Sequence, residues 1–155
     1  MQIVSKILLW IGVALFLISL CMPSVYYGGH DGPVEALGIV AVCSTPVFIY
    51  FGFISICLGR FGLGLLLIGL ASCNFLILFC ILLYGQLAQG RWFKTLFAVV
   101  PLAGVAWFYP KPGHSYQFGF PEVRNGYYVW ATSVSVIALA LIVVAVSAHL
   151  RGKRP

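Results

Sequence analysis

EALGIVAVCSTPVFIYFGFISICLGR, residues 35–60, is the stretch that decides how this chain folds. Twenty-four uncharged residues lie between Glu35 and Arg60, and Pro46 interrupts them after ten residues, with thirteen still to come. Proline removes one backbone donor from a helix and clashes with the preceding turn. As helices the two pieces would be about 15 and 20 Å long, and each would cover roughly half of a bilayer. The stretch therefore predicts either a re-entrant segment that turns back at Pro46 or a membrane span kinked there, with Ser44 and Thr45 bonding the freed carbonyls.

The composition is that of an integral membrane protein. Of 155 residues, 62% are hydrophobic and 8% are charged, and the mean hydropathy is +1.06. A soluble domain carries about 25% charged residues. The net charge is +6, but the basic residues are spread along loop positions and the C-terminal tail. This spread argues against nucleic-acid binding and favours orientation by the positive-inside rule, so the first partner we expect is a lipid bilayer.

Charged residues divide the chain into five apolar segments, and a span needs about 20 residues. We expect an all-α integral membrane protein that forms a single membrane domain over residues 1–155. Its four transmembrane helices are predicted at 7–22, 64–85, 92–109 and 127–149, and the re-entrant or kinked segment at 36–59.

Counting Lys and Arg on each side distinguishes the possible arrangements. Five crossings with the N-terminus inside leave four basic residues in the cytoplasm and five outside, and the inverted chain has five inside and four outside. If 36–59 enters from outside and returns, six are inside and three outside. If 92–109, which contains Pro101, is the re-entrant element instead, the count is five against four, and this alternative stays open. Both surviving arrangements are N-in/C-in, with outer loops at 23–35 and 110–126; the second loop has the composition of a turn or short strand pair.

Asn74 is the most polar residue at membrane depth. We expect its amide to bond a neighbouring helix rather than a ligand. No Asp, Glu, Lys or Arg lies deep within the apolar segments, which disfavours a proton-coupled transporter. The small residues Ala131, Ser135, Ala138 and Ala145 share one stripe of the last span and predict close helix packing.

Tyr127, Tyr128 and Trp130 gather where the last span should meet the outer interface. The predicted outer loops hold His30 and His114, together with acidic residues. Their spacing matches no metal motif, so we interpret both as solvated loop histidines. The five cysteines include no C-x-x-C pair. We therefore expect no catalytic set, no metal and no cofactor.

Several short motifs together resemble a group of small bacterial multi-pass inner-membrane proteins. They are CMPSVYYGG, VEALG, ASCNF, GRWFK and NGYYVWATS. The residues that match the pattern of that group are Pro23, Tyr26, Asn74, Gly90, Arg91, Gly126, Tyr127, Tyr128, Trp130 and Ser133. Phe75 departs from it, since the group has proline there. The resemblance implies the bacterial inner membrane and brings no activity with it.

For function, the sequence favours a non-enzymatic protein that contacts another protein in the membrane or at its periplasmic face. An immunity protein against a membrane-active toxin and an accessory subunit of a larger complex both fit. The alternative from a different class is a small carrier or channel for a neutral or apolar solute.

Overall fold

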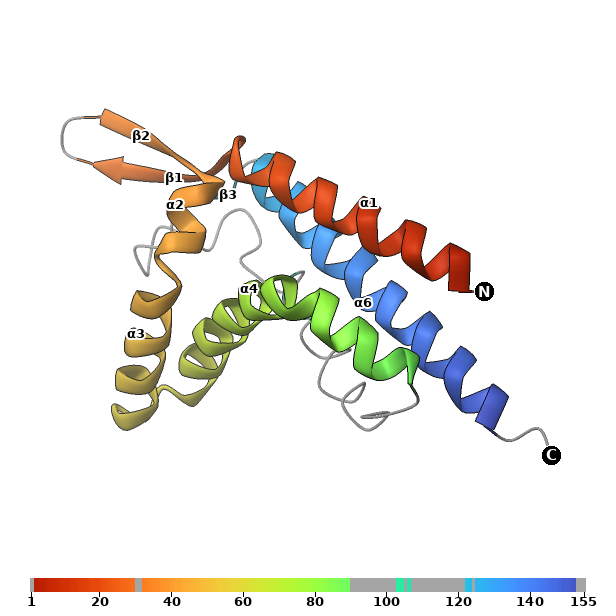
Figure 1. The fold of residues 1–155 in the computed structure, drawn as a ribbon. Coiled ribbons are helices and arrows are strands. Elements are labelled where there is room, and N and C mark those ends of the chain that lie inside the picture. The colour runs from red at the N-terminus through yellow and green to blue at the C-terminus, as the bar shows by residue number, and fades with distance from the viewer. Residues whose placement is uncertain are drawn as a thin grey trace.

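The computed structural model describes residues 2–29, 32–89, 103–104, 106, 122–123 and 125–152 of the chain. The helices are α1 (Gln2–Leu20), α2 (Gly38–Cys43), α3 (Thr45–Cys57), α4 (Phe61–Ala88) and α6 (Asn125–Gly152), and the strands are β1 (Pro23–Gly29), β2 (Gly32–Leu37) and β3 (Glu122–Val123) (Figure 1). Within these ranges α1, α4 and α6 are long and apolar enough to cross a membrane, and α3 is a shorter apolar helix. The prediction of a largely helical chain with helices of membrane-spanning length is confirmed. The number of spans and their direction stay predictions.

α1 and α6 lie side by side as an antiparallel pair, which we call the α1–α6 pair (Figure 1). Both chain ends lie at one end of this pair, and the strands lie at the other. Gly12 allows the close approach, because a Cβ there would lie 2.5 Å from Cγ1 of Ile137 and 3.3 Å from the backbone oxygen of Ser133. Without a hydrophobic driving force in lipid, such small-residue contacts are what let helices associate.

The stripe of small residues on α6 faces the helix core. Ala131, Ala138 and Ala145 are buried, and Ser135 is half-buried. The stripe therefore contributes to packing within the chain.

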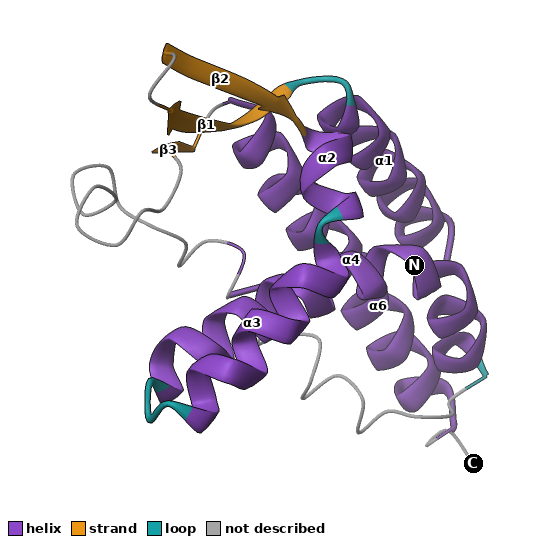
Figure 2. Ribbon diagram, turned by 90° about the vertical axis from the view of Figure 1, so that its left-hand side faces the viewer, coloured by secondary structure: helices purple, strands orange, loops and turns teal. Residues whose placement is uncertain are grey.

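The strands form an antiparallel sheet of order β2-β1-β3 (Figure 2). β1 and β2 make a hairpin whose last pair is Gly29 and Gly32. β3 pairs with β1 through Val123 opposite Val25. The sheet thus joins two segments that are about a hundred positions apart in the sequence, at the end of the α1–α6 pair away from the termini.

The hairpin was not expected, because the sequence predicts a loop over 23–35. Val25, Tyr26 and Tyr27 are residue types that favour strands, and glycines on either side of a two-residue connection favour a tight hairpin. This local pattern overrides the predicted loop. Within the second predicted loop, 110–126, the structure describes β3 and the first residues of α6.

The stretch 36–59 forms two helices rather than one. α2 ends at Cys43, and α3 begins at Thr45 with Pro46 in its first turn. Proline is tolerated there because a first-turn N–H has no helical partner in any case. A break beside Pro46 was expected in both alternatives, and it does not distinguish a kinked span from a re-entrant segment.

The chain reverses at Leu58–Arg60, so the predicted turn at Pro46 is wrong, while the choice between a re-entrant segment and a kinked span stays a prediction. Gly59 adopts φ +78°, a left-handed conformation that favours glycine, and its N–H donates to the carbonyl of Ile56 at 2.9 Å. α3 and the first half of α4 then pack against each other as antiparallel neighbours. Gly52 and Gly64 form the seam, since a Cβ on Gly64 would lie 2.6 Å from the backbone oxygen of Gly52.

α4 is a single helix over Phe61–Ala88, longer than the predicted span at 64–85, and it is visibly bent (Figure 1). Its first half packs on α3, and its second half reaches α1, where Tyr84 and Ser5 share a hydrogen bond of 2.8 Å. Gly69 lies between these halves, and the hydroxyl of Ser72 donates to the carbonyl of Ile68 at 2.8 Å. A serine bonded to its own helix in this way bends it.

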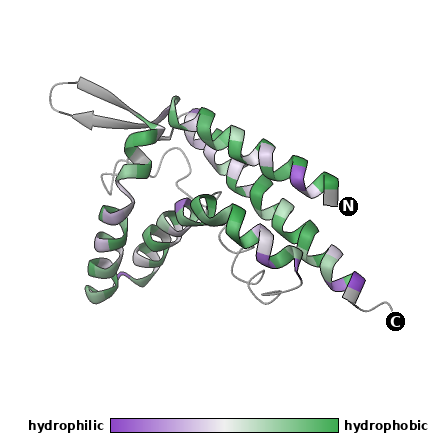
Figure 3. Ribbon diagram, viewed as in Figure 1, coloured by the Kyte–Doolittle hydropathy of each residue, from purple (hydrophilic) through white to green (hydrophobic). Residues whose placement is uncertain are grey.

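Apolar residues cover the helices on all sides, and hydrophilic ones are few (Figure 3). Side chains such as Trp10, Phe53, Leu65 and Leu82 are more than half exposed. Helices that are apolar all round belong inside a large core or in a membrane, and these side chains lie outside the core that the described residues form.

The predicted span at 92–109 lies outside the described residues, apart from Ala103, Gly104 and Ala106. Ala106 is fully buried against the helix core.

Candidate functional site: a hydrogen-bonded junction of helices

Asn74 lies at the centre of a polar junction within the helices. Its side chain is 6% exposed. Its Nδ2 donates to Oγ1 of Thr45 at 2.8 Å, and its Oδ1 accepts from Nε1 of Trp130 at 2.9 Å. One amide therefore joins α4 to α3 on one side and to α6 on the other, as expected of a polar residue at membrane depth.

Thr45 continues the junction to α2. Its hydroxyl donates to the carbonyl of Val42 at 2.6 Å. In an unbroken helix the N–H of residue 46 would bond this carbonyl, and Pro46 has none. The hydroxyl of Ser44 likewise donates to the carbonyl of Val40 at 2.8 Å. Both hydroxyls thus compensate for the helix break, and the predicted bonds from Ser44 and Thr45 to backbone carbonyls are present.

The three side chains form a donor chain with one direction. The indole N–H of Trp130 donates to Asn74, Asn74 donates to Thr45, and Thr45 donates to Val42. Hydrogen bonds in such a chain polarise one another, and the effect is stronger in a low-dielectric interior. We call Thr45, Asn74 and Trp130 the junction.

The aromatic residues at the start of α6 lie beside the junction. The ring centroid of Tyr127 is 5.4 Å from that of Trp130 and 6.0 Å from that of Tyr128. The hydroxyl of Tyr127 donates to the carbonyl of Ala106 at 2.6 Å, which ties the described part of 92–109 to α6. Tyr127 and Trp130 are thus engaged inside the chain, whereas Tyr128 is 43% exposed.

Of the remaining predicted site residues, the structure describes only Pro46, and Pro46 does not join the junction. Pro46 is exposed at the start of α3. His30 and His114 lie outside the described residues. Among the residues that the structure does describe, no three His, Cys, Asp or Glu side chains come together in a way that could hold a metal ion.

The chemistry of the junction is that of a structural hydrogen-bond network between helices. An amide, a hydroxyl and an indole carry no charge at neutral pH, and none is a strong acid or base. Their buried polar atoms bond one another and the backbone. The junction can therefore fix helix positions, and it offers no proton-transfer group.

Two features of the junction were missed at the level of sequence. Thr45 was expected to bond its own helix backbone but not Asn74, and Trp130 was assigned to the interface rather than to Asn74. The residue types indicated that such partners exist, since a buried amide in a membrane needs a donor for its oxygen and an acceptor for its N–H. Thr45 meets Asn74 because the chain reverses at Leu58–Arg60, whereas the sequence predicted a reversal at Pro46.

No family model, no curated protein and no solved structure matches this chain.

Proposed function

We propose that this chain is a non-enzymatic, multi-pass membrane protein that acts by contacting another protein at the face of the membrane on which its sheet lies. The observation that carries the proposal is the sheet that stands at one end of the α1–α6 pair. The buried polar side chains of the junction, by contrast, are bonded within the chain.

The sheet is held firmly to the helices, as a contact surface needs to be. A Cβ on Gly126, at the start of α6, would lie 2.7 Å from the backbone oxygen of Pro23. The N–H of Gly38 donates to the carbonyl of Met22 at 3.0 Å. A surface pre-positioned in this way loses little entropy when a partner binds.

The orientation follows from the basic residues near the chain ends. Lys6 and Arg151 lie on the helices that end beside the two termini. The positive-inside rule favours the cytoplasm for that end, so the sheet faces the periplasm of a bacterial inner membrane. This agrees with the N-in/C-in prediction and with the resemblance to bacterial inner-membrane proteins.

A periplasm-facing contact surface suits two roles. An immunity protein would meet a membrane-active toxin as it arrives from the periplasm, and an accessory subunit would hold a larger membrane complex. Both roles need a rigid membrane anchor and an exposed platform, and neither needs a catalytic group.

The rival function is a small carrier or channel for a neutral or apolar solute. A pathway for a neutral polar solute needs polar groups that are free to line it, and Asn74 is instead bonded at both its oxygen and its nitrogen. We therefore rank contact with a protein above transport.

The deciding experiment deletes the gene and measures two quantities. The first is survival when a toxin encoded beside the gene is produced, and the second is the steady-state level of any protein that co-purifies with the chain. A photo-crosslinking residue at Val34 in β2 should capture the same protein, and one at Leu139 on α6, whose side chain is half exposed, serves as the control. If deletion changes neither quantity, contact with a protein is the wrong function.

Transport is tested separately with purified protein in liposomes. Uptake or conductance that disappears when Asn74 is replaced, with folding retained, would favour the rival.

A further inference from the structure

α3, the turn Leu58–Arg60 and residues 61–74 of α4 form a unit that we call the α3–α4 hairpin. Its two arms pack on each other along the Gly52–Gly64 seam. Its root is the junction, where Thr45 and Asn74 are bonded. The hairpin is thus fixed at its root, and its turn is free of the α1–α6 pair.

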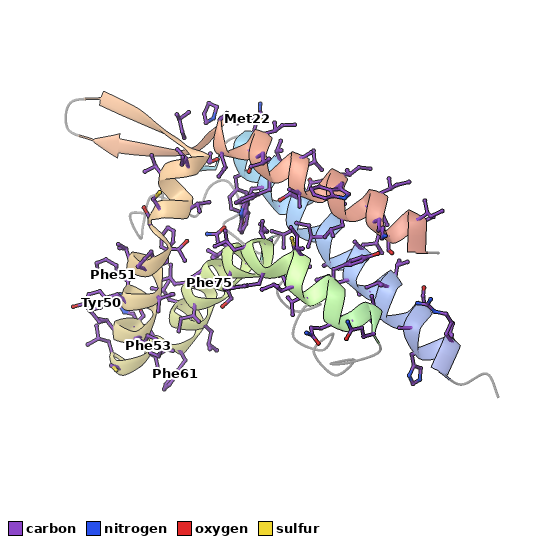
Figure 4. All side chains as sticks on the ribbon, viewed as in Figure 1. Met22, Tyr50, Phe51, Phe53, Phe61 and Phe75 are labelled. Carbon is purple, nitrogen blue, oxygen red and sulfur yellow. The ribbon has the colours of Figure 1, made fainter. Side chains whose placement is uncertain are left out.

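The hairpin is apolar on every side that the seam does not cover. Its exposed large apolar side chains come from both arms and from the turn. They are Val47, Tyr50, Phe51, Phe53, Leu58, Phe61 and Leu65. Figure 4 shows Tyr50, Phe51, Phe53 and Phe61 projecting outward around the end of the hairpin. A partner protein that covered one face would leave the others in water.

Only one residue of the hairpin is charged. Between Thr45 and Asn74 the sequence contains no Asp, Glu or Lys and a single arginine, Arg60, which is exposed in the turn. A guanidinium is expensive at the centre of a bilayer and reaches for the interface whenever its stem allows. Arg60 therefore limits where the turn can lie.

The direction of the hairpin limits the depth at which Arg60 can lie. In both views it leads away from the α1–α6 pair rather than alongside it (Figures 1 and 2). Its root is level with Trp130, within two helical turns of the start of α6. A hairpin arm of 13 residues is about 20 Å long, so one directed along the pair would carry Arg60 most of the way across a hydrocarbon core about 30 Å thick, toward the end where the termini lie. One directed across the pair keeps Arg60 near the depth of Trp130.

We infer that the α3–α4 hairpin lies within the lipid of the sheet-side leaflet, with acyl chains around its arms and Arg60 at the headgroup phosphates. The occupant of its exposed apolar surface is lipid because that surface surrounds the hairpin and carries one charge, which lies at its tip. This inference does not depend on any protein partner of the sheet.

Cys57 provides a near-native probe of the turn. It is exposed three residues before Arg60, whereas Cys73 and Cys80 are buried and stay unlabelled. With Cys21→Ser and Cys43→Ser, a nitroxide spin label at Cys57 reports on its surroundings in phosphatidylethanolamine–phosphatidylglycerol liposomes. Collisions with oxygen measure exposure to lipid, and collisions with a water-soluble nickel chelate measure exposure to water.

The expected result at Cys57 is collision with oxygen that is more frequent than collision with nickel, with a smaller excess than at a lipid-facing position deep in the bilayer, because Arg60 holds the turn just beneath the phosphates. A label at Leu139→Cys, made in a chain with Cys57→Ser as well, gives the reference for a lipid-facing helix. Frequent nickel collision would place the hairpin in water, and low values for both would place it against protein or a second copy. Either outcome overturns the inference.

Arg60 is tested by depth. Arg60→Leu removes the group that reaches the phosphates, so the ratio of oxygen to nickel collisions at Cys57 should rise as the turn sinks. Arg60→Lys keeps the charge and should leave the ratio unchanged. An unchanged ratio in Arg60→Leu would show that Arg60 does not set the depth of the hairpin.

Discussion

At the scale of single residues, the chain handles its few buried polar groups by bonding them to one another. Asn74 bonds through both ends of its amide, and Thr45 both accepts from Asn74 and donates to Val42. In lipid no water replaces a lost partner. Removing one member therefore leaves the others unsatisfied.

Asn74→Leu should lower the free energy of unfolding in detergent by about 2 kcal/mol, because two hydrogen bonds are lost and Thr45 and Trp130 lose a partner. Denaturant or thermal unfolding followed by circular dichroism measures the change. Adding Trp130→Phe should cost less in the Asn74→Leu background than alone, since the bond between the two residues is already gone. Strictly additive costs would mean that the two side chains are not coupled.

Gly12→Ala should destabilise the α1–α6 pair by about 1–3 kcal/mol, because its Cβ would overlap Ile137 and approach the backbone of α6. Gly85→Ala is the matched control, since a Cβ at that helical glycine meets nothing within 4 Å. The control should be neutral or gain up to about 1 kcal/mol from helix propensity. Equal losses in both variants would contradict the close contact at Gly12.

At the scale of elements, residues 35–60 show what the sequence predicts and what it does not. The break near Pro46 and the hydroxyls that compensate for it follow from proline chemistry, and the structure has both. The place of the reversal does not follow, because proline also suits the first turn of a new helix. The reversal occurs where Gly59 takes a positive φ, a conformation that no hydrophobic pattern encodes.

The partners of Asn74 could not be predicted for the same reason. Thr45 reaches Asn74 only if α3 and α4 are antiparallel neighbours, and this depends on the turn at Leu58–Arg60. By contrast, α1 and α6 fall on the apolar segments that hydropathy identifies, although α1 begins five residues before its predicted segment and α6 ends three residues after its own.

Gly59→Ala tests the turn itself. Nothing lies within 4 Å of a Cβ at Gly59, so the cost is backbone strain of about 1–2 kcal/mol. Gly62→Ala also adds its Cβ in open space, without a positive φ, and should change stability by much less. The measurement is the unfolding midpoint of each variant in the same detergent. A loss in Gly62→Ala as large as that in Gly59→Ala would argue against strain at the turn.

At the scale of the whole molecule, the antiparallel α1–α6 pair places both chain ends at one end and the sheet at the other (Figure 1). The sheet draws on segments after α1 and before α6, so it closes the end of the pair that lies away from the termini. Because α1 and α6 are antiparallel, the direction in which one crosses a membrane fixes the direction of the other.

Reporter fusions test that arrangement. Green fluorescent protein should fluoresce, and alkaline phosphatase should be inactive, at both the N-terminus and the C-terminus, because the proposed orientation places both in the cytoplasm. Alkaline phosphatase inserted between Gly29 and Gly32 in the hairpin should be active. Opposite signals at the two termini would contradict an α1–α6 pair that crosses the membrane.

The donor chain from Trp130 to Val42 also determines the stage of synthesis at which all hydrogen bonds of the junction can form. Asn74 and Thr45 leave the ribosome more than fifty residues before Trp130. The amide oxygen of Asn74 therefore lacks the indole N–H of Trp130 as a donor until the last helix enters the bilayer. A nascent chain halted before residue 125 therefore carries a buried acceptor without its native donor, and quality-control proteases should degrade it faster than the finished protein.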